Sequence, residues 1–391
     1  MSPSPHPRSP GWKPGATAGW KPAATHAAPG SPERPSTIDP YPETSAGRDR
    51  WILSRRSPRP HRDVRLPQGF FVEPERGESG DLVEVLTILL TSRECPWRCL
   101  MCDLWQHTVK ESIPVGAVPA QIDHALRDVL TAREATMPFP SQIKLYNAGS
   151  FFDPLALPPD DYDEIARRLR GFNRVVVECH PALVGDRCLA FRDRLAAWPP
   201  APSALGIGGP RLEVAMGLET IHPKVLDRLN KRMTPGQFSV AAAFLRQNGI
   251  AVRAFILVQP PFLDETEGLV WAQKSVEFAF DCGVGAATLI PTRPGNGALD
   301  ALAQLGQFTP PRLLTLERAV ESGIGLNRGR VFADTWDLEQ FSDCAECFPA
   351  RAARLRQMNL QQQIPHPVTC QACGTSRAAG GELIPTYERQ T

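Results

Sequence analysis

The stretch Glu94-Cys-Pro-Trp-Arg-Cys-Leu-Met-Cys-Asp-Leu-Trp105 decides how this chain folds, because it joins an apolar run to three closely spaced cysteines. The run, Leu82 to Leu90, is typical of a buried strand. Cys95, Cys99 and Cys102 follow it at C-x3-C-x2-C spacing on one short loop. Fe–S clusters normally take four cysteines, so a loop that supplies three would leave one iron open to a small molecule. The alternatives are a zinc knuckle, which more usually shows paired C-x2-C elements, and cysteines that are close by chance.

Length and composition limit the possible number of domains, partners and cellular locations. The chain has 391 residues, enough for two or three domains, and a formal net charge of +1, which argues neither for nor against a nucleic-acid partner. Without a run of 18 apolar residues, no spanning helix and no membrane partner are expected. The first residues lack an apolar signal-peptide core. The 10 cysteines fall mostly into metal-like spacings, which suits a reducing compartment and predicts a cytoplasmic location.

The N-terminal part differs in composition from the rest. Residues 1–60 are rich in Pro, Ser, Gly and Ala and predict a disordered extension, since such a segment buries too little to offset its ordering entropy. Residues 51–65 are basic. The arginines of this basic lead-in could contact nucleic-acid phosphates, or the segment could be solvated and flexible.

From Leu82 onward, strand-like and helix-like segments alternate, which favours an α/β fold with a parallel sheet. The predicted strands are Leu82–Thr91, Gln142–Tyr146, Arg174–Cys179, Leu212–Gly217, Ile250–Val258 and Ala286–Ile290. Six such units predict a partial (βα)6 TIM-like barrel over residues 61–305, with its site in the loops after the strands.

Residues 306–391 are predicted to form a small Cys-rich C-terminal domain. Cys344-x2-Cys347 and Cys370-x2-Cys373 are two C-x2-C pairs that can together bind one metal. Zinc is the first choice, and an auxiliary 4Fe-4S cluster is the alternative, because both accept four cysteines. Cys179 and Cys188 have no partner spacing and are expected to be buried thiols, and Cys282 is also left outside both cysteine groups.

The cysteine loop resembles that of the radical S-adenosylmethionine (SAM) superfamily, together with Gly149-Ser-Phe151, Glu178-x-His-Pro181 and Gly217-Leu-Glu219. With the C-terminal cysteine pairs, the chain is most similar to the Elongator-catalytic-subunit-like branch and, within it, to the group containing the archaeosine-forming radical-SAM subunit. The resemblance implies a 4Fe-4S cluster that binds SAM and cleaves it to a 5′-deoxyadenosyl radical. It also implies a reductant such as flavodoxin or ferredoxin, and a modified nucleobase in tRNA as substrate.

The resemblance also implies which residues bind the cofactor. Asn147, Gly149 and Ser150 correspond to the glycine-rich loop that contacts the SAM amino group. Glu178 and Glu219 are expected near SAM, and Arg232 or its neighbour Lys231 could pair with the SAM carboxylate. The alternative for the two cations is a helix C-terminus that complements its dipole.

Three further residues each have two possible interpretations. His180 is either a proton donor or a structural histidine. Arg293 and Asn296 either contact substrate or belong to an irregular loop.

Two functions from different classes remain. The first is a radical-SAM enzyme acting on a nucleobase in tRNA. The second is a non-catalytic zinc or Fe–S protein that binds RNA through its tail and its basic lead-in.

Overall fold

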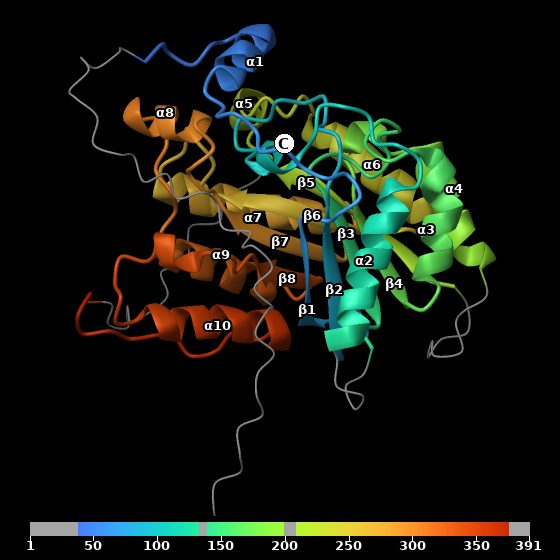
Figure 1. The fold of residues 1–391 in the computed structure, drawn as a ribbon. Coiled ribbons are helices and arrows are strands. Elements are labelled where there is room, and N and C mark those ends of the chain that lie inside the picture. The colour runs from blue at the N-terminus through green and yellow to red at the C-terminus, as the bar shows by residue number, and fades with distance from the viewer. Residues whose placement is uncertain (1–37, 133–138, 199–208, 375–391) are drawn as a thin grey trace, which may run out of the picture.

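The computed structural model describes residues 38–132, 139–198 and 209–374 (Figure 1). Their strands form a single sheet in the order β1 to β8. The strands are β1 (Gly69–Arg76), β2 (Leu82–Leu90), β3 (Gln142–Asn147), β4 (Arg174–Glu178), β5 (Arg211–Glu219), β6 (Ala251–Val258), β7 (Ala286–Pro291) and β8 (Arg330–Ala333). Strand β1 is antiparallel to β2, and every later neighbour is parallel.

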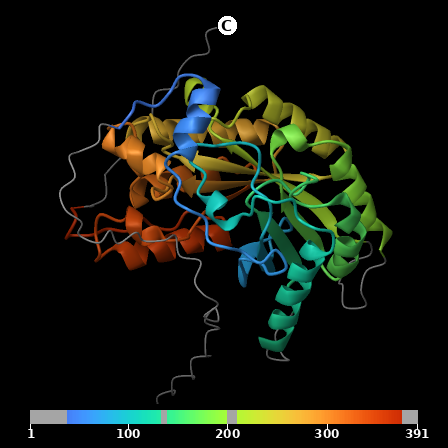
Figure 2. The same ribbon diagram turned by 45° about the horizontal axis from the view of Figure 1, so that its top comes forward.

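Helices surround this sheet on its outer side (Figure 2). The helices of the described residues are α1 (Ser45–Leu53), α2 (Ala117–Ala132), α3 (Tyr162–Leu169), α4 (Asp186–Ala197), α5 (Pro223–Arg228), α6 (Pro235–Gln247), α7 (Glu265–Asp281), α8 (Ala298–Gln304), α9 (Leu313–Gly325) and α10 (Phe348–Gln361). Short 3-10 turns lie at Leu104–His107, Pro159–Asp161, Pro181–Leu183 and Leu338–Phe341. No helix of the described residues is long and apolar enough to cross a membrane.

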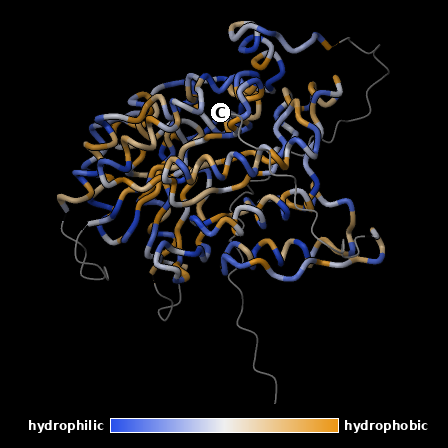
Figure 3. Tube along the Cα trace, turned by 180° about the vertical axis from the view of Figure 1, so that it is seen from behind, coloured by the Kyte–Doolittle hydropathy of each residue, from blue (hydrophilic) through white to orange (hydrophobic). Residues whose placement is uncertain are grey.

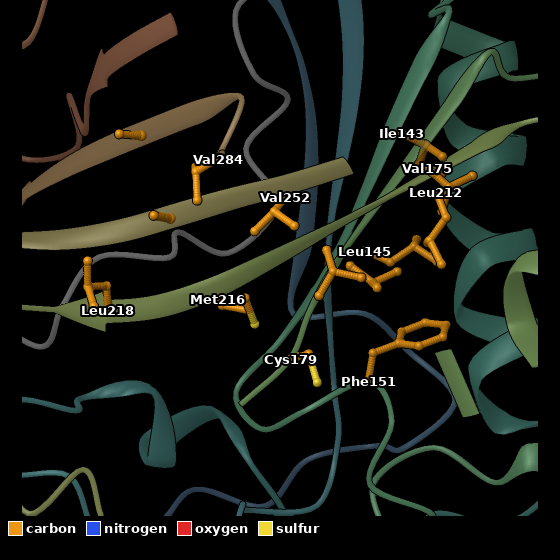
Figure 4. Packing of buried hydrophobic residues seen from close by; sticks show 14 of the residues in the cluster. Ile143, Leu145, Phe151, Val175, Cys179, Leu212, Met216, Leu218, Val252 and Val284 are labelled. Carbon is orange, nitrogen blue, oxygen red and sulfur yellow. The ribbon is translucent and has the colours of Figure 1, made fainter. Parts of the chain in front are cut away.

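The predicted α/β half-barrel is confirmed, with the six predicted strands present as β2 to β7. Alternation along each strand explains the two faces of the sheet. Ile143, Val175 and Leu212 are register partners on β3, β4 and β5, and they pack together against the helices (Figure 4). Hydrophobic and hydrophilic positions therefore alternate along the chain trace (Figure 3).

The inner face of the sheet carries charges. Glu75 on β1 accepts hydrogen bonds from Lys144 on β3 at 2.5 Å and from Arg253 on β6 at 2.6 Å. Arg253 also bonds Glu213 on β5, at 2.8 Å. A single carboxylate can reach β3 and β6 only because the sheet curls, so this buried network spans the interior of the half-barrel.

Strands β1 and β8 were not predicted. The sequence of β1 contains Pro74, and β8 is only four residues long. Neither segment therefore shows a clear alternation of apolar and polar residues. Strand β8 and α10 come from the segment predicted to form a small C-terminal domain; β8 pairs with β7, and α10 packs on β1 and β8. The sheet is thus continuous across residue 305.

The prediction of disorder over residues 1–60 is wrong for residues 38–60, while 1–37 lie outside the described residues. Helix α1 begins after Thr44, whose side chain accepts a hydrogen bond from Gly47 N. Tyr41 and Trp51 are buried and stack edge to face at 5.0 Å. They pack with α5 and α8, and this apolar contact supplies the burial that composition alone did not indicate.

Candidate functional site

The three loop cysteines line one cavity of about 470 Å³ at the ends of the parallel strands. The loop is fixed by backbone contacts rather than by apolar packing alone. Leu100 N donates to Leu229 O at 2.9 Å, and Asn296 Nδ2 donates to Leu100 O at 2.8 Å. Asn296, predicted as a possible substrate contact, therefore holds the cysteine loop from the segment after β7.

The basic lead-in turns inward instead of facing solvent. Arg56 binds Glu94 at 2.5 Å, Arg98 lies 3.2 Å from it, and Arg59 binds its second oxygen. Burial alone would raise the pKa of Glu94. The hydrogen bond from Arg56 and its positive charge outweigh this effect, so the pKa of Glu94 is lowered. Neither interpretation of this segment fits these arginines, because they anchor the residue that precedes Cys95.

His180 supports the loop as a neutral side chain. Its ring stacks on Trp97, with centroids 3.7 Å apart and planes 10° apart. Nε2 faces Lys231 O at 3.1 Å, and Nδ1 accepts from Ala182 N at 3.1 Å, so the proton belongs on Nε2. Burial and the charge of Lys231 lower the His180 pKa to about 3. The structural interpretation of His180 is therefore the one this geometry favours.

The loop after β3 brings polar atoms to the cavity. Asn147 is 4% exposed, and within the described part of the chain both polar atoms of its side-chain amide lack a hydrogen-bond partner. Gly149 packs closely against the cysteine loop, since a Cβ there would lie 3.2 Å from Arg93 O. Glu178 accepts from Asn147 N at 3.1 Å, and burial raises its pKa to about 8. Asn147, Gly149 and Glu178 all line the cavity.

A buried ion pair forms the adjacent wall. Lys231 Nζ donates to Glu219 Oε1 at 2.7 Å. Glu219 has a φ of +62°, which is uncommon for a residue other than glycine. Gly217 makes room for the pair, because a Cβ there would overlap both charged ends. Burial opposes the charge of Lys231, but Glu219 raises its pKa, so Lys231 stays protonated.

Two predicted cofactor contacts lie elsewhere. Arg232 pairs with Asp49 on α1. Ser150 is buried, and its Oγ accepts from His180 N at 3.3 Å. Neither is among the described residues that line the cavity. Of the two adjacent cations, the structure brings Lys231 to the cavity and leaves Arg232 outside.

The far wall of the cavity combines residues of the predicted strands β3 and β6 with β1 and the segment after β8, which the sequence did not reveal. Phe71 of β1 meets Trp336 at a centroid distance of 5.2 Å, and Tyr146 meets Phe255 at 5.9 Å. Asp334, directly after β8, binds Arg293 at 2.8 Å. Arg293 thus holds this carboxylate, and no sequence signal joined β1 and β8 to the site.

The thiols of the loop fit a metal cluster. Burial raises the pKa of Cys95 and Cys102, and that of Cys99 to about 12, so thiolates would form there on metal binding. Among the described residues, the four C-terminal cysteines are the only His, Cys, Asp or Glu group that is tight enough for a single ion. The loop cysteines do not form such a group, which fits a larger cluster better than one ion.

The C-terminal cysteines converge as predicted. Cys344 and Cys370 sulfurs are 3.9 Å apart, and Cys347 and Cys373 sulfurs are 3.8 Å apart. All four sulfurs lie within 4.8 Å of one another. This group could hold a metal ion, and it lies at the opposite end of α10 from the cavity residue Asn359.

Comparison with known proteins agrees with the family resemblance that the sequence motifs indicated. The chain is 25% identical over 259 residues to archaeosine synthase subunit beta of Methanosarcina acetivorans, a match that covers 61% of this chain and 66% of that protein. It is 29% identical over 141 residues to archaeosine synthase subunit beta of Thermococcus kodakarensis, covering 35% and 40%. These matches confirm the resemblance inferred from the sequence, and both are to subunits of an enzyme. The chain thus spans less than two thirds of the length of these relatives.

No family model matches the chain. Solved structures with a similar arrangement include Elp3 of Methanocaldococcus infernus, at 11% identity and a TM-score of 0.44, covering 61% of this chain and 59% of that one. Methylornithine synthase shares 13% identity at a TM-score of 0.39, covering 62% of each chain.

Proposed function

We propose that this chain, which is similar to archaeosine synthase subunit beta, is a radical-SAM enzyme that cleaves SAM reductively. The observation that carries the proposal is one cavity that holds three cysteines, an unpartnered amide and a buried Lys–Glu pair. Cys95, Cys99 and Cys102 would hold a 4Fe-4S cluster. When bound, that cluster would supply one electron to break the S–C5′ bond of SAM, which yields methionine and a 5′-deoxyadenosyl radical.

The remaining cavity residues suit the amino-acid end of SAM. Its ammonium and carboxylate form a zwitterion, and Lys231 with Glu219 presents the complementary pair of charges. Asn147 can donate to one group and accept from the other. Gly149 lets the backbone of this loop approach Arg93 and Cys95 closely, which keeps room for the ligand.

The far wall suits a planar substrate with hydrogen-bond donors. Aromatic rings of Phe71, Tyr146 and Trp336 offer faces and edges for stacking. Asp103 also lines the cavity, and burial raises the pKa of its carboxyl group. A hydrogen-bond donor on the substrate would stabilise this carboxylate. A modified nucleobase in tRNA, the substrate class that the sequence resemblance implies, fits these walls. A small reductant such as flavodoxin or ferredoxin would deliver the electron, and a reducing compartment such as the cytoplasm suits the thiols.

The alternative, a non-catalytic protein that binds RNA through its tail and its basic lead-in, requires a lead-in that faces solvent. Arg56 and Arg59 instead bind Glu94 next to the cysteine loop. Their side chains are 7% and 16% exposed, so they offer little charge to a phosphate backbone. The cavity therefore favours the enzyme.

The proposal is tested by anaerobic reconstitution with iron and sulfide, followed by SAM and dithionite. The wild type should yield 5′-deoxyadenosine, and Cys99→Ser should yield none. Cys282→Ser is the matched control, since Cys282 caps the C-terminus of α7, is not among the described residues that line the cavity, and should leave the yield unchanged. Equal product from wild type and Cys99→Ser would refute the proposal.

A further inference from the structure

The edge strand β8 has an unusual neighbour. Val331 N donates to Gln362 Oε1 at 2.7 Å, and Gln362 Nε2 donates back to Val331 O at 2.9 Å. Two residues along the strand, Ala333 N donates to Asn359 Oδ1 at 2.7 Å, and Asn359 Nδ2 donates to Ala333 O at 2.9 Å. Two side-chain amides thus satisfy the backbone groups that a further strand would otherwise pair.

Helix α10 therefore takes the place of the strand that would continue the half-barrel. It packs against β8 and against β1, the two edge strands of the sheet, and lies beside both in Figure 1. Asn359 also lines the cavity, next to Ala333 and Asp334. The position of α10 thus sets one wall of the cavity as well as the edge of the sheet.

Little apolar burial holds the chain after α10 in place. Most of residues 363–374 are exposed, and Ile364 is 50% exposed. The segment is attached through Arg354, whose Nε donates to His366 O at 2.9 Å and whose Nη2 donates to Pro365 O at 2.6 Å. A segment with so little core needs another link to keep its place.

The four cysteines supply that link. Cys344 and Cys347 immediately precede α10, and Cys370 and Cys373 end the segment that returns along it. Four sulfurs at about 2.3 Å from a single tetrahedral ion lie roughly 3.8 Å from one another. Two of the six separations, 3.9 Å for Cys344–Cys370 and 3.8 Å for Cys347–Cys373, agree with that geometry, and all four sulfurs lie within 4.8 Å of one another. In a cubane each sulfur binds a different iron, so the iron–iron edges would push the sulfurs farther apart.

The surroundings also fit thiolates. Arg351 is 4% exposed and donates from Nε to Cys347 Sγ at 3.4 Å. Its Nη1 donates to Glu317 on α9 at 2.8 Å. One buried cation thus joins the sulfur group to α9, and a guanidinium that donates to sulfur stabilises a metal-bound thiolate.

We infer that Cys344, Cys347, Cys370 and Cys373 bind one tetrahedral ion, zinc rather than a cluster, and that this ion clasps α10 so that it closes the open edge of the half-barrel. The inference goes beyond SAM cleavage and does not depend on it. Removing the ion should loosen α10, and with it the amide contacts to β8.

The test uses the full chain and measures metal content together with hydrogen exchange. Wild type should contain about one zinc per chain, and Cys370→Ser should lose it while keeping the iron of the cysteine loop. In the same variant, a peptide over residues 330–333 should exchange at least about tenfold faster, because its amides lose a fixed partner. Cys282→Ser should change neither quantity. Asn359→Ala should speed exchange at Ala333 with zinc retained, which separates the edge contact from the metal.

If Cys370→Ser does not fold, wild type treated with a zinc chelator gives the same comparison. One extra iron per chain in place of zinc would support a single ion but overturn its assignment as zinc. A loss of about four irons on Cys370→Ser would overturn the single ion in favour of a cubane. Zinc loss with unchanged exchange over residues 330–333 would overturn the clasp.

Discussion

Glu94 is where the N-terminal segment is fastened to the cysteine loop, so Glu94→Gln should destabilise the protein strongly. Its carboxylate is 10% exposed and binds Arg56 and Arg59, whose side chains are 7% and 16% exposed. Removing one partner of a buried ion pair costs about 3–5 kcal/mol, because the remaining charges lose their compensation. Arg98 and Arg59 keep some contact with water, so we expect the lower end, about 3 kcal/mol.

Urea unfolding followed by tryptophan fluorescence measures this loss. With a slope of about 3 kcal/mol per M, the midpoint should fall by roughly 1 M. The matched control is Asp281→Asn, which removes a surface pair with Arg328 whose side chains are 65% and 43% exposed. That control should cost at most about 1 kcal/mol. A Glu94→Gln midpoint equal to that of the control would refute the buried clamp.

Three other changes test the interior and the cavity. Glu213→Gln should cost about 3–5 kcal/mol in urea unfolding, since Glu213 is buried between Arg174 and Arg253; a loss under 1 kcal/mol would contradict a buried network. Because burial lowers the folded pKa of His180 to about 3 while its unfolded value is near 6.5, its contribution is present above pH 6.5 and is lost as the pH falls toward 3. Between pH 7 and pH 5 the wild type should lose about 2 kcal/mol that His180→Gln does not lose, measured as the difference in urea midpoints; parallel pH profiles would exclude a buried neutral histidine. Asn147→Ala should weaken SAM binding by roughly 10- to 100-fold in calorimetry with the reconstituted protein, as two hydrogen bonds are lost; unchanged affinity would place SAM away from this amide.

The sequence predicted the parts of the fold that have strong periodicity. Strands β2 to β7 are apolar on the helix-facing side. The converging C-x2-C pairs also followed from spacing alone. These features are local, so a few neighbouring residues define them.

The remaining features depend on contacts between distant segments. Strand β1 is recognisable only because it pairs with β2, and β8 only because it pairs with β7. The basic residues near Arg56 gave no sign that they face Glu94, which lies 38 residues away. Likewise, adjacent Lys231 and Arg232 are equivalent in sequence, but the backbone sends one to Glu219 and the other to Asp49.

The most direct test of the central claim is the production of 5′-deoxyadenosine by the anaerobically reconstituted full chain given SAM and dithionite. We expect product from wild type and from Cys370→Ser, and none from Cys95→Ser, Cys99→Ser or Cys102→Ser. Absence of 5′-deoxyadenosine from wild type that carries about four irons per chain would contradict a SAM-cleaving site at this loop.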